Sequence, residues 1–409
     1  MIKLLHTADW HIGQTFFDYP RKAEHLHFLG WLRDQIRQQG VDVLLIAGDV
    51  FDTPNPSADS QKMFYKFLRE ITTDNSALQV VVIAGNHDSA ARLEAPNPLL
   101  EEMNITIKGI VKRTADGLID YQRLIVPLTK DGEVAAWCMA VPYLRQGDYP
   151  EAESYPLGVK AMYEALLQEV LKVRQPNQAI VAMGHLHAAG GIVSENDRSE
   201  RTIVGGEECV SPDAFSNEIV YTALGHLHRG QQVCGREEVR YAGAPLPMSF
   251  AEKNYKQSVA LVEIEGAAVT KIEKLLYDAP VKVLSIPNEA KPLEEVLEEI
   301  DKLPEGEITE TSPYLEVKVL ITEPEPSLRN RIEEALKTKS VRLARLGAVQ
   351  VGRDAESKTF TYEELQAITP MEIARMEFEK QFGGEEMPET MKNLLQSVIQ
   401  EIEHEDISN

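Results

Sequence analysis

The first part of the chain, up to about residue 183, alternates between short apolar runs and longer stretches with apolar residues at helical spacing. Short β-branched runs predict buried strands, and a repeat near 3.6 residues predicts amphipathic helices. We expect strands at Ile2–His6, Val41–Ala47, Gln79–Ala84, Val134–Ala140 and Ala179–Met183. We expect helices near Lys22–Gln38, Ser57–Ile71 and Ala90–Met103. Strands that alternate with helices indicate a layered α/β fold.

The pattern changes in residues 218–276, where strand-like runs follow one another without long helices between them. The expected strands are Ile219–Ala223, Val239–Ala242, Ser258–Ile264 and Ala268–Leu276. Such a succession favours a second, more antiparallel sheet. Together the two sheets predict a β-sandwich flanked by helices, which we assign to a domain of residues 1–280.

A smaller unit follows at residues 281–351. Its pattern is strand, helix, strand, helix: Val281–Ser285, a helix near Pro292–Leu303, Tyr314–Ile321 and a helix near Ser327–Thr338. This predicts a small α/β capping domain.

The end of the chain has a different character. Residues 352–369 are polar and predict a linker, whereas residues 370–409 predict two amphipathic helices around a turn at Gly383–Gly384. Their apolar stripe could pack back on the preceding domain or dock on the helices of a partner. We favour the partner, because the linker would separate these helices from the core.

Composition narrows the class of protein. No apolar run of membrane-spanning length occurs in the 409 residues, and the N-terminal stretch meets polar residues too early for a signal peptide. Three scattered cysteines favour a reducing, cytoplasmic location. The net charge of -23 argues against a general basic coat for nucleic acid. A phosphate substrate is still possible, because bound cations invert the local field.

The polar residues that could bind a metal or take part in catalysis directly follow predicted strands. They lie at the edge where α/β sheets bind ligands. They are Asp9, His11, Asp49, Asp52, Asn86, His87, His185, His226 and His228. Asp and Asn are also common in ordinary turns, which is the alternative reading of any one of them. Together they form an oxygen and imidazole set without thiolates, which suits Mn²⁺, Fe or Zn²⁺. There are more ligands than one ion needs, and a shared Asp would suit a two-metal phosphoryl-transfer site.

The order DxH, GDxxD, GNHD, GH and GHxH over residues 6–228 resembles that of the calcineurin-like metallophosphoesterases, with all five blocks intact. The flanking stretches LLHTADWHIGQ, LLIAGDVFDTPNPS, VVIAGNHDS, YTALGHLHRGQ and YAGAPLPMSFAE resemble the SbcD family of nuclease subunits. The resemblance implies a first ion held by Asp9, His11, Asp49 and His228, and a second held by Asp49, Asn86, His185 and His226.

The same resemblance implies roles for residues outside the ligand set. His87 would protonate the leaving oxygen without binding metal. Asp52 would orient and charge-stabilise His87. The tetrapeptide GHLH occurs twice, at 184–187 and 225–228, and His187 of the first copy matches no required position, so we expect a non-ligand.

The activity that the resemblance implies is metal-dependent cleavage of DNA by two divalent ions, with Mn²⁺ favoured. It would combine 3′→5′ exonuclease action on duplex ends, driven by an SbcC-type coiled-coil ATPase, with endonuclease action on single strands and hairpins. It would serve recombination, replication and repair. It also implies a homodimer within a heterotetramer, formed through Ser57–Ile71 and Ala90–Met103.

Two alternatives remain at this point. One is another metallophosphoesterase, such as a phosphatase or a cyclic-nucleotide phosphodiesterase, which would share the site but has no obvious need for residues 281–409. The other is a regulatory scaffold subunit with an inactive site. The intact ligand set speaks against the scaffold.

Overall fold

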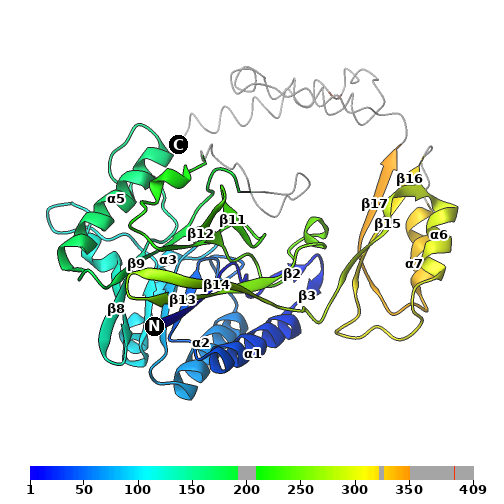
Figure 1. Ribbon diagram of the computed structural model, residues 1–409. Coiled ribbons are helices and arrows are strands. Elements are labelled where there is room, and N and C mark those ends of the chain that lie inside the picture. The colour runs from blue at the N-terminus through cyan, green and yellow to red at the C-terminus, as the bar shows by residue number, and fades with distance from the viewer. Residues whose placement is uncertain (192–208, 322–326, 351–390, 392–409) are drawn as a thin grey trace, which may run out of the picture. The chain divides into compact units, whose positions relative to one another are not determined.

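The structure is a computed structural model that describes residues 1–191, 209–321, 327–350 and 391 (Figure 1). Residues 1–351 form one compact unit. The predicted linker 352–369 and the predicted C-terminal helices, apart from Met391, lie outside the described residues. Among the described residues, no helix combines the length and the apolar character that crossing a bilayer requires.

The first large sheet has six strands in the order β14-β13-β1-β4-β5-β6. Neighbours from β1 to β6 run parallel, while β13 and β14 are antiparallel to their neighbours. The strands are β1 (Ile2–Thr7), β4 (Val43–Ala47), β5 (Gln79–Ile83), β6 (Ile105–Lys108), β13 (Ser258–Glu265) and β14 (Ala268–Leu276).

The second large sheet also has six strands, in the order β11-β12-β10-β9-β8-β7. Neighbours from β8 to β12 are parallel, and β7 and β11 are antiparallel to theirs. The strands are β7 (Ile125–Lys130), β8 (Glu133–Ala140), β9 (Ala179–His185), β10 (Tyr221–Gly225), β11 (Gln231–Val233) and β12 (Arg236–Tyr241).

The assignment of strands to sheets differs from the sequence prediction. Residues 218–276 do not build a separate, mostly antiparallel sheet. Instead, β10 and β12 extend the sheet of β8 and β9, whereas β13 and β14 complete the sheet of β1. Strand pairing joins residues that are far apart in sequence, such as Ile2 and Ile264, so a local pattern cannot decide it.

The two sheets pack face to face as a sandwich with helices on both outer sides, which confirms the predicted fold class. Apolar residues of both sheets, such as Leu45 and Val181, form the central layer. The helices α1 (Lys22–Gln39) and α2 (Ala58–Asp74) cover the first sheet, and α5 (Tyr155–Val173) covers the second (Figure 1). With both faces of each sheet covered, the central strands are buried throughout, which explains their continuous apolar runs.

Short elements complete this part of the chain. The single helix expected at Ala90–Met103 is divided into three pieces, because Pro96 and Pro98 lack the backbone N–H groups that a continuous helix needs. The pieces are α3 (Ala90–Glu94), α4 (Asn97–Leu100) and η1 (Glu101–Met103). The other short elements are β2 (Thr15–Phe16), β3 (Tyr19–Pro20), η2 (Tyr121–Leu124), η3 (Pro212–Ala214) and η4 (Phe250–Glu252).

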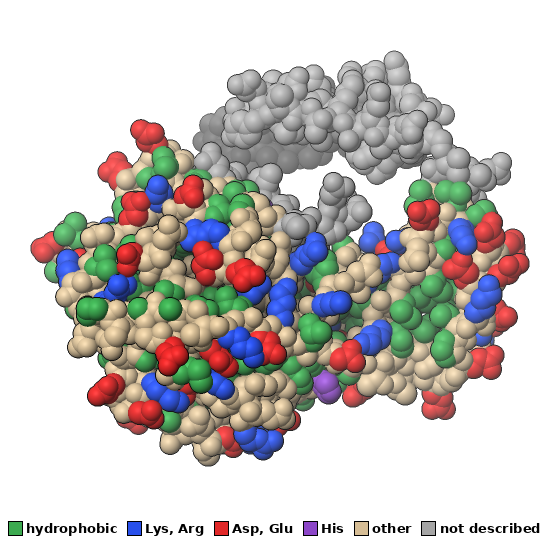
Figure 2. All heavy atoms as spheres, in the orientation of Figure 1, with side chains coloured by type: hydrophobic (Ala, Val, Ile, Leu, Met, Phe, Trp, Pro, Cys, Tyr) green, Lys and Arg blue, Asp and Glu red, His purple; other side chains and the backbone are tan. Residues whose placement is uncertain are grey.

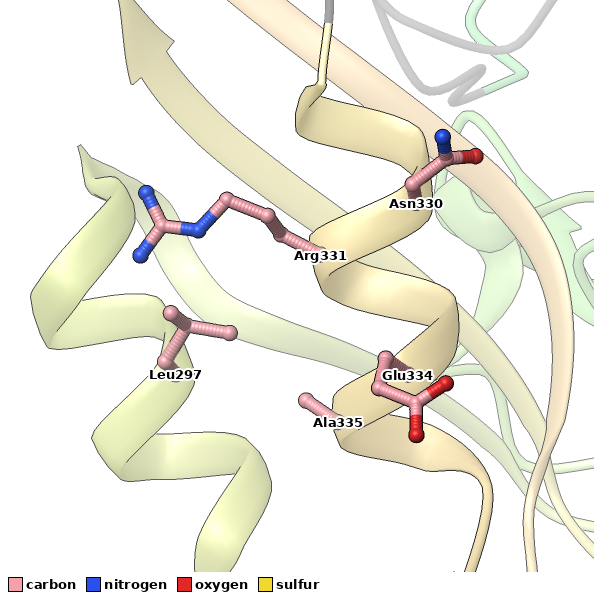
Figure 3. A pocket seen from close by; sticks show the side chains of 5 residues that line it. All are labelled: Leu297, Asn330, Arg331, Glu334 and Ala335. Atoms are coloured by element: carbon pink, nitrogen blue, oxygen red, sulfur yellow. The ribbon is translucent and has the colours of Figure 1, made fainter.

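Residues beyond 280 form a parallel three-stranded sheet in the order β15-β16-β17, with two helices packed on it. The elements are β15 (Val283–Pro292), α6 (Leu293–Asp301), β16 (Tyr314–Ile321), α7 (Leu328–Leu336) and β17 (Arg342–Gln350). The last strand, β17, was not expected from the sequence. Figure 3 shows a shallow pocket between α6 and α7, into which Leu297 and Ala335 turn their apolar side chains.

An aromatic cluster connects the small sheet to the sandwich. Phe16, Phe250, Val281 and Tyr314 pack together, and the rings of Phe16 and Tyr314 stack with centroids 4.5 Å apart. The hydroxyl of Tyr314 donates to a carboxylate oxygen of Glu24 at 2.6 Å. A buried network therefore joins β16 to the start of α1.

Candidate metal centre

Nine side chains predicted for the site come together where the parallel strands of both large sheets end. Turns after β1, β4 and β5 carry those from the first sheet, and the ends of β9 and β10 carry those from the second. The two sheets meet here directly, because the Nδ1 atom of His185 lies 2.9 Å from the carbonyl oxygen of Ala47 at the end of β4. All nine lie among the described residues: Asp9, His11, Asp49, Asp52, Asn86, His87, His185, His226 and His228.

The backbone around these residues is unusual. Asp9, His11, Asp49 and His226 all have positive φ, between 45° and 104°. A residue other than glycine in this conformation costs about 1–3 kcal/mol, and such residues cluster at functional sites. Gly85 is required by close approach, because a Cβ there would overlap the carboxylate of Asp49. Local backbone geometry is thus set to bring the side chains inward.

Asp49 lies at the middle of the cluster. Ligand atoms of Asp9, Asp49 and His185 lie within 4.8 Å of one another, and so do those of His11, Asp49 and His87. Asp49 therefore belongs to two groups, each compact enough to hold an ion. Their membership differs from the predicted division, because Asp9 groups with His185 and the predicted non-ligand His87 groups with His11.

The remaining predicted ligands adjoin the two groups. The Oδ1 atom of Asn86 lies 3.0 Å from His185 Nε2 and 3.1 Å from His226 Nδ1. The rings of His11 and His228 lie 5.2 Å apart in an edge-to-face arrangement. Within the described part of the chain, neither group includes His187, whose ring lies 6.3 Å from that of His226.

The charged side chains of the cluster are buried, and their protonation depends on one another. Burial raises the pKa of Asp9. Burial also disfavours ionised Asp49, but His185 and His11 outweigh burial and hold the pKa of Asp49 below its usual range. For His185 burial favours the neutral ring, yet Asp49 outweighs it and raises the pKa of His185. The ionised form of Asp49 thus depends on positive charge beside it, which the neighbouring histidines provide here and which a bound divalent ion would provide in their place.

Two buried atoms support the same conclusion. Asp9 Oδ2 and His11 Nε2 are shielded from solvent and have no hydrogen-bond partner. A buried polar atom without a partner costs about 1–3 kcal/mol, so its presence calls for a ligand. Carboxylate, amide and imidazole donors are the set that Mn²⁺, Fe or Zn²⁺ accepts. The residues present therefore fit the divalent ions that the sequence predicts.

His87 lies at the edge of the cluster, and its contacts differ from the expected ones. Its backbone N–H donates to Asp49 Oδ1 at 2.8 Å. Its Nδ1 atom lies 2.9 Å from the backbone carbonyl of Asp52, not from the carboxylate. The Asp52 carboxylate instead lies 3.5 Å from Nδ1 of His11. In the turn after β4, the backbone carbonyl of Asp52 faces His87, whereas the side chain of Asp52 faces His11 in the turn after β1.

Asp88, the residue after His87, orients the turns of the site and does not cap the helix that follows it. The N-cap position of α3 is Ser89, so Asp88 does not cap it. Its buried carboxylate accepts backbone N–H groups from Gly85 at 2.9 Å, Val50 at 3.2 Å and Phe51 at 3.0 Å. Asp88 thus fastens the turn after β5 to the turn after β4. The only sequence signal is its position next to Asn86 and His87.

Glu252 is a further buried carboxylate at the site, and the sequence analysis gave it no role. Its Oε1 atom lies 2.9 Å from Nδ1 of His228. The signal that could have found it is its place at the end of YAGAPLPMSFAE, a stretch without any other acidic residue.

Comparisons with known proteins agree with the family that the sequence motifs predict. The calcineurin-like phosphoesterase family matches residues 2–230, and the type 5 capsule protein repressor C-terminal domain matches residues 280–382. The SbcD subunit of the SbcCD nuclease of Rhodobacter capsulatus is 37% identical, over 84% of this chain and 87% of its own length. The proteins of the same name are 25% identical in Escherichia coli, over 97% of both chains, and 29% identical in Bacillus subtilis, over 99% of this chain and 100% of that one.

Proposed function

The chain belongs to the calcineurin-like phosphoesterase family, and on this premise we propose that it is a metal-dependent DNA nuclease of the SbcD type. The observation that carries the proposal is the central place of Asp49, which lies in one compact group with Asp9 and His185 and in another with His11 and His87. Two ions that share a carboxylate are the arrangement that clamps the attacking and leaving oxygens of an in-line phosphoryl displacement. Likeness to the SbcD subunits of SbcCD nucleases along most of the chain then selects the nuclease among the phosphoesterases.

We assign the ligands as the family resemblance implies. Asp49 would serve both ions. The others would be Asp9, His11 and His228 for the first ion, and Asn86, His185 and His226 for the second. The mixed nitrogen and oxygen donors favour Mn²⁺. When bound, divalent ions supply a nucleophilic water at neutral pH and neutralise charge on the phosphate.

We propose that His87 moves a proton in this reaction. A carbonyl oxygen only accepts hydrogen bonds, so the contact with Asp52 fixes a proton on Nδ1 of His87. Nε2 is then the nitrogen that, in the doubly protonated ring, can hand a proton to the leaving oxygen of the cleaved strand, while Nδ1 keeps its own. The partly exposed position of His87 leaves it accessible to a substrate at the mouth of the site.

DNA as substrate has to be reconciled with an acidic protein. On the face drawn in Figure 2, acidic and basic side chains are interspersed. The net charge of -23 means that general attraction between the protein and phosphates is weak. We therefore expect the ions of the metal centre to provide much of the local attraction for the scissile phosphate.

The choice between a nuclease and a small-molecule phosphoesterase is tested by substrate preference. In Mn²⁺ the purified chain is expected to convert closed circular single-stranded DNA to linear products, and chelation of the metal should stop the reaction. Hydrolysis of p-nitrophenyl phosphate should be much slower under the same conditions. Rapid hydrolysis of the small ester with the circle left intact would assign another phosphoesterase activity.

We further propose that work on duplex ends requires an SbcC-type coiled-coil ATPase, and that two copies of this chain pair through α2 and the segment from α3 to η1. Such an assembly would be a heterotetramer. A DNA substrate places the protein in the cytoplasm, where its three free cysteines stay reduced.

The proposed partner contact is tested by truncation. Residues 370–409 have apolar residues at helical spacing and an excess of acidic ones, which suits a partner's helices better than DNA. A chain cut after Thr369 is expected to keep Mn²⁺-dependent cleavage of single strands but to lose co-purification with the ATPase and ATP-dependent work on duplex ends. The full-length chain, purified in parallel, is the control. Undiminished binding would locate the contact elsewhere, and lost single-strand cleavage would assign these residues to the nuclease itself.

A further inference from the structure

The stretch Tyr241–Glu252 follows β12 and ends in a carboxylate that the proposed ligand set does not use. Glu252 closes the short turn η4 and is only 1% exposed. Burying a carboxylate is costly unless its oxygens are bonded or paired. Its position therefore needs an explanation from its contacts.

Each oxygen of Glu252 has a defined partner. Oε2 accepts the backbone N–H of Met248 at 2.8 Å, and Oε1 lies 2.9 Å from Nδ1 of His228. The His228 side chain is itself 5% exposed, so this contact is shielded from water. A carboxylate accepts hydrogen bonds and does not donate them. Nδ1 of His228 must then carry the proton, which leaves the lone pair on Nε2.

We propose that Glu252 is a positioning residue of the metal centre, which holds His228 in the tautomer and ring orientation that offer Nε2 to a divalent ion. The inference rests on the proposed function for the presence of the ion. Imidazole ligands commonly donate their other N–H to a carboxylate, which fixes the ring and raises its basicity as a ligand.

The backbone segment that donates to Oε2 of Glu252 is itself held in place. The carbonyl of Pro247, next to Met248, accepts a hydrogen bond from the Arg21 guanidinium at 2.6 Å. Arg21 is 1% exposed and forms an ion pair with Glu24 at 2.8 Å. Glu24 in turn accepts the hydroxyl of Tyr314 in β16. A continuous series of buried bonds thus fixes the loop from which Glu252 reaches His228.

A purely structural role for Glu252 predicts a different result from a positioning role. If Glu252 only closed the turn with Met248, its removal would lower stability and leave the properties of His228 unchanged. If Glu252 positions His228, its removal alters the tautomer of that ring and lowers the affinity for one ion more than for the other. Glu316 provides a matched control, because it is a buried carboxylate in β16 that accepts a hydrogen bond from Ser285 at 2.8 Å.

The experiment compares the full-length wild type with Glu252→Ala, Glu252→Gln and Glu316→Ala. Mn²⁺ binding is followed by the electron paramagnetic resonance of the free ion, and folding by circular dichroism. Glu252→Ala is expected to lower the affinity for one of two Mn²⁺ ions by about 10–100-fold and to leave the affinity for the other nearly unchanged. Glu252→Gln should lie between this variant and the wild type, because its amide oxygen can still accept from Nδ1. Glu316→Ala should bind both ions as the wild type does.

A second measurement does not depend on the metal. In the metal-free protein, ¹⁵N shifts of the His228 ring should report a proton on Nδ1 in the wild type and a mixture of tautomers in Glu252→Ala. If Glu252→Ala does not fold, Glu252→Gln is compared in both measurements. Wild-type affinity for both ions together with an unchanged His228 tautomer would overturn the inference. Failure of the wild type to bind two ions would instead refute the proposed metal centre, while the tautomer measurement still decides the role of Glu252.

Discussion

Replacing Asp49 with alanine is expected to remove both ions and essentially all DNA cleavage, while the chain stays folded. Asp49 is the buried residue that both groups contain, so the substitution removes ligand atoms from both at once. Its carboxylate also accepts the backbone N–H of His87, so the variant loses a contact of the turn after β5. Metal content measured after gel filtration, together with circular dichroism, tests this expectation.

His187→Ala is the matched control for that experiment. His187 lies beside His226, in a tetrapeptide with the same letters as the one that carries His226 and His228, and belongs to neither ligand group among the described residues. It should therefore keep the metal content of the wild type. Loss of a full ion equivalent from His187→Ala would show that the first copy of GHLH contributes more than His185.

Replacing His87 with alanine is expected to leave both ions and DNA binding in place and to slow cleavage by about 10²–10⁴-fold, the usual contribution of general acid catalysis. The reason is the proton that Nε2 would supply to the leaving oxygen. The loss should shrink on a p-nitrophenyl phosphodiester, because that leaving group departs without needing a proton. An equal loss on both substrates would argue against proton transfer, and loss of an ion would make His87 a ligand.

The variant Asp52→Asn distinguishes the contact of Asp52 with His87 from its contact with His11. Only the backbone carbonyl of Asp52 meets His87, and a side-chain replacement leaves that carbonyl in place. The carboxylate lies near Nδ1 of His11. The variant should therefore affect metal affinity through His11 and retain the dependence on leaving group that His87 produces.

The position of the candidate site at one edge of the sheets could be predicted from the sequence because its side chains follow continuous apolar runs. The runs at Val43–Ala47 and Gln79–Ile83 are buried strands, and parallel neighbours bring their ends to one edge. Which strands share a sheet could not be predicted, since partners such as Leu4 and Val262 are joined by pairing across most of the chain. The strand Arg342–Gln350 was missed because charged residues interrupt its apolar positions.

Within the site, residue type and position after strands predicted which side chains gather there, but not the residues that hold the turns. Asp88 bonds to N–H groups 37 and 38 residues earlier, and Glu252 bonds to a ring 24 residues earlier. Such contacts depend on how separate turns meet in space. For Asp52 the family resemblance implied a neighbour of His87, whereas the choice between its side chain and its carbonyl depends on local backbone direction.

The most direct test of the two-metal account is anomalous diffraction from crystals grown with Mn²⁺. The account predicts two anomalous peaks about 3.5–4 Å apart, with the Asp49 carboxylate between them. The first peak should lie beside Asp9, His11 and His228, and the second beside Asn86, His185 and His226. A single peak, or a pair in which one ion lies out of reach of Asp49, would contradict it.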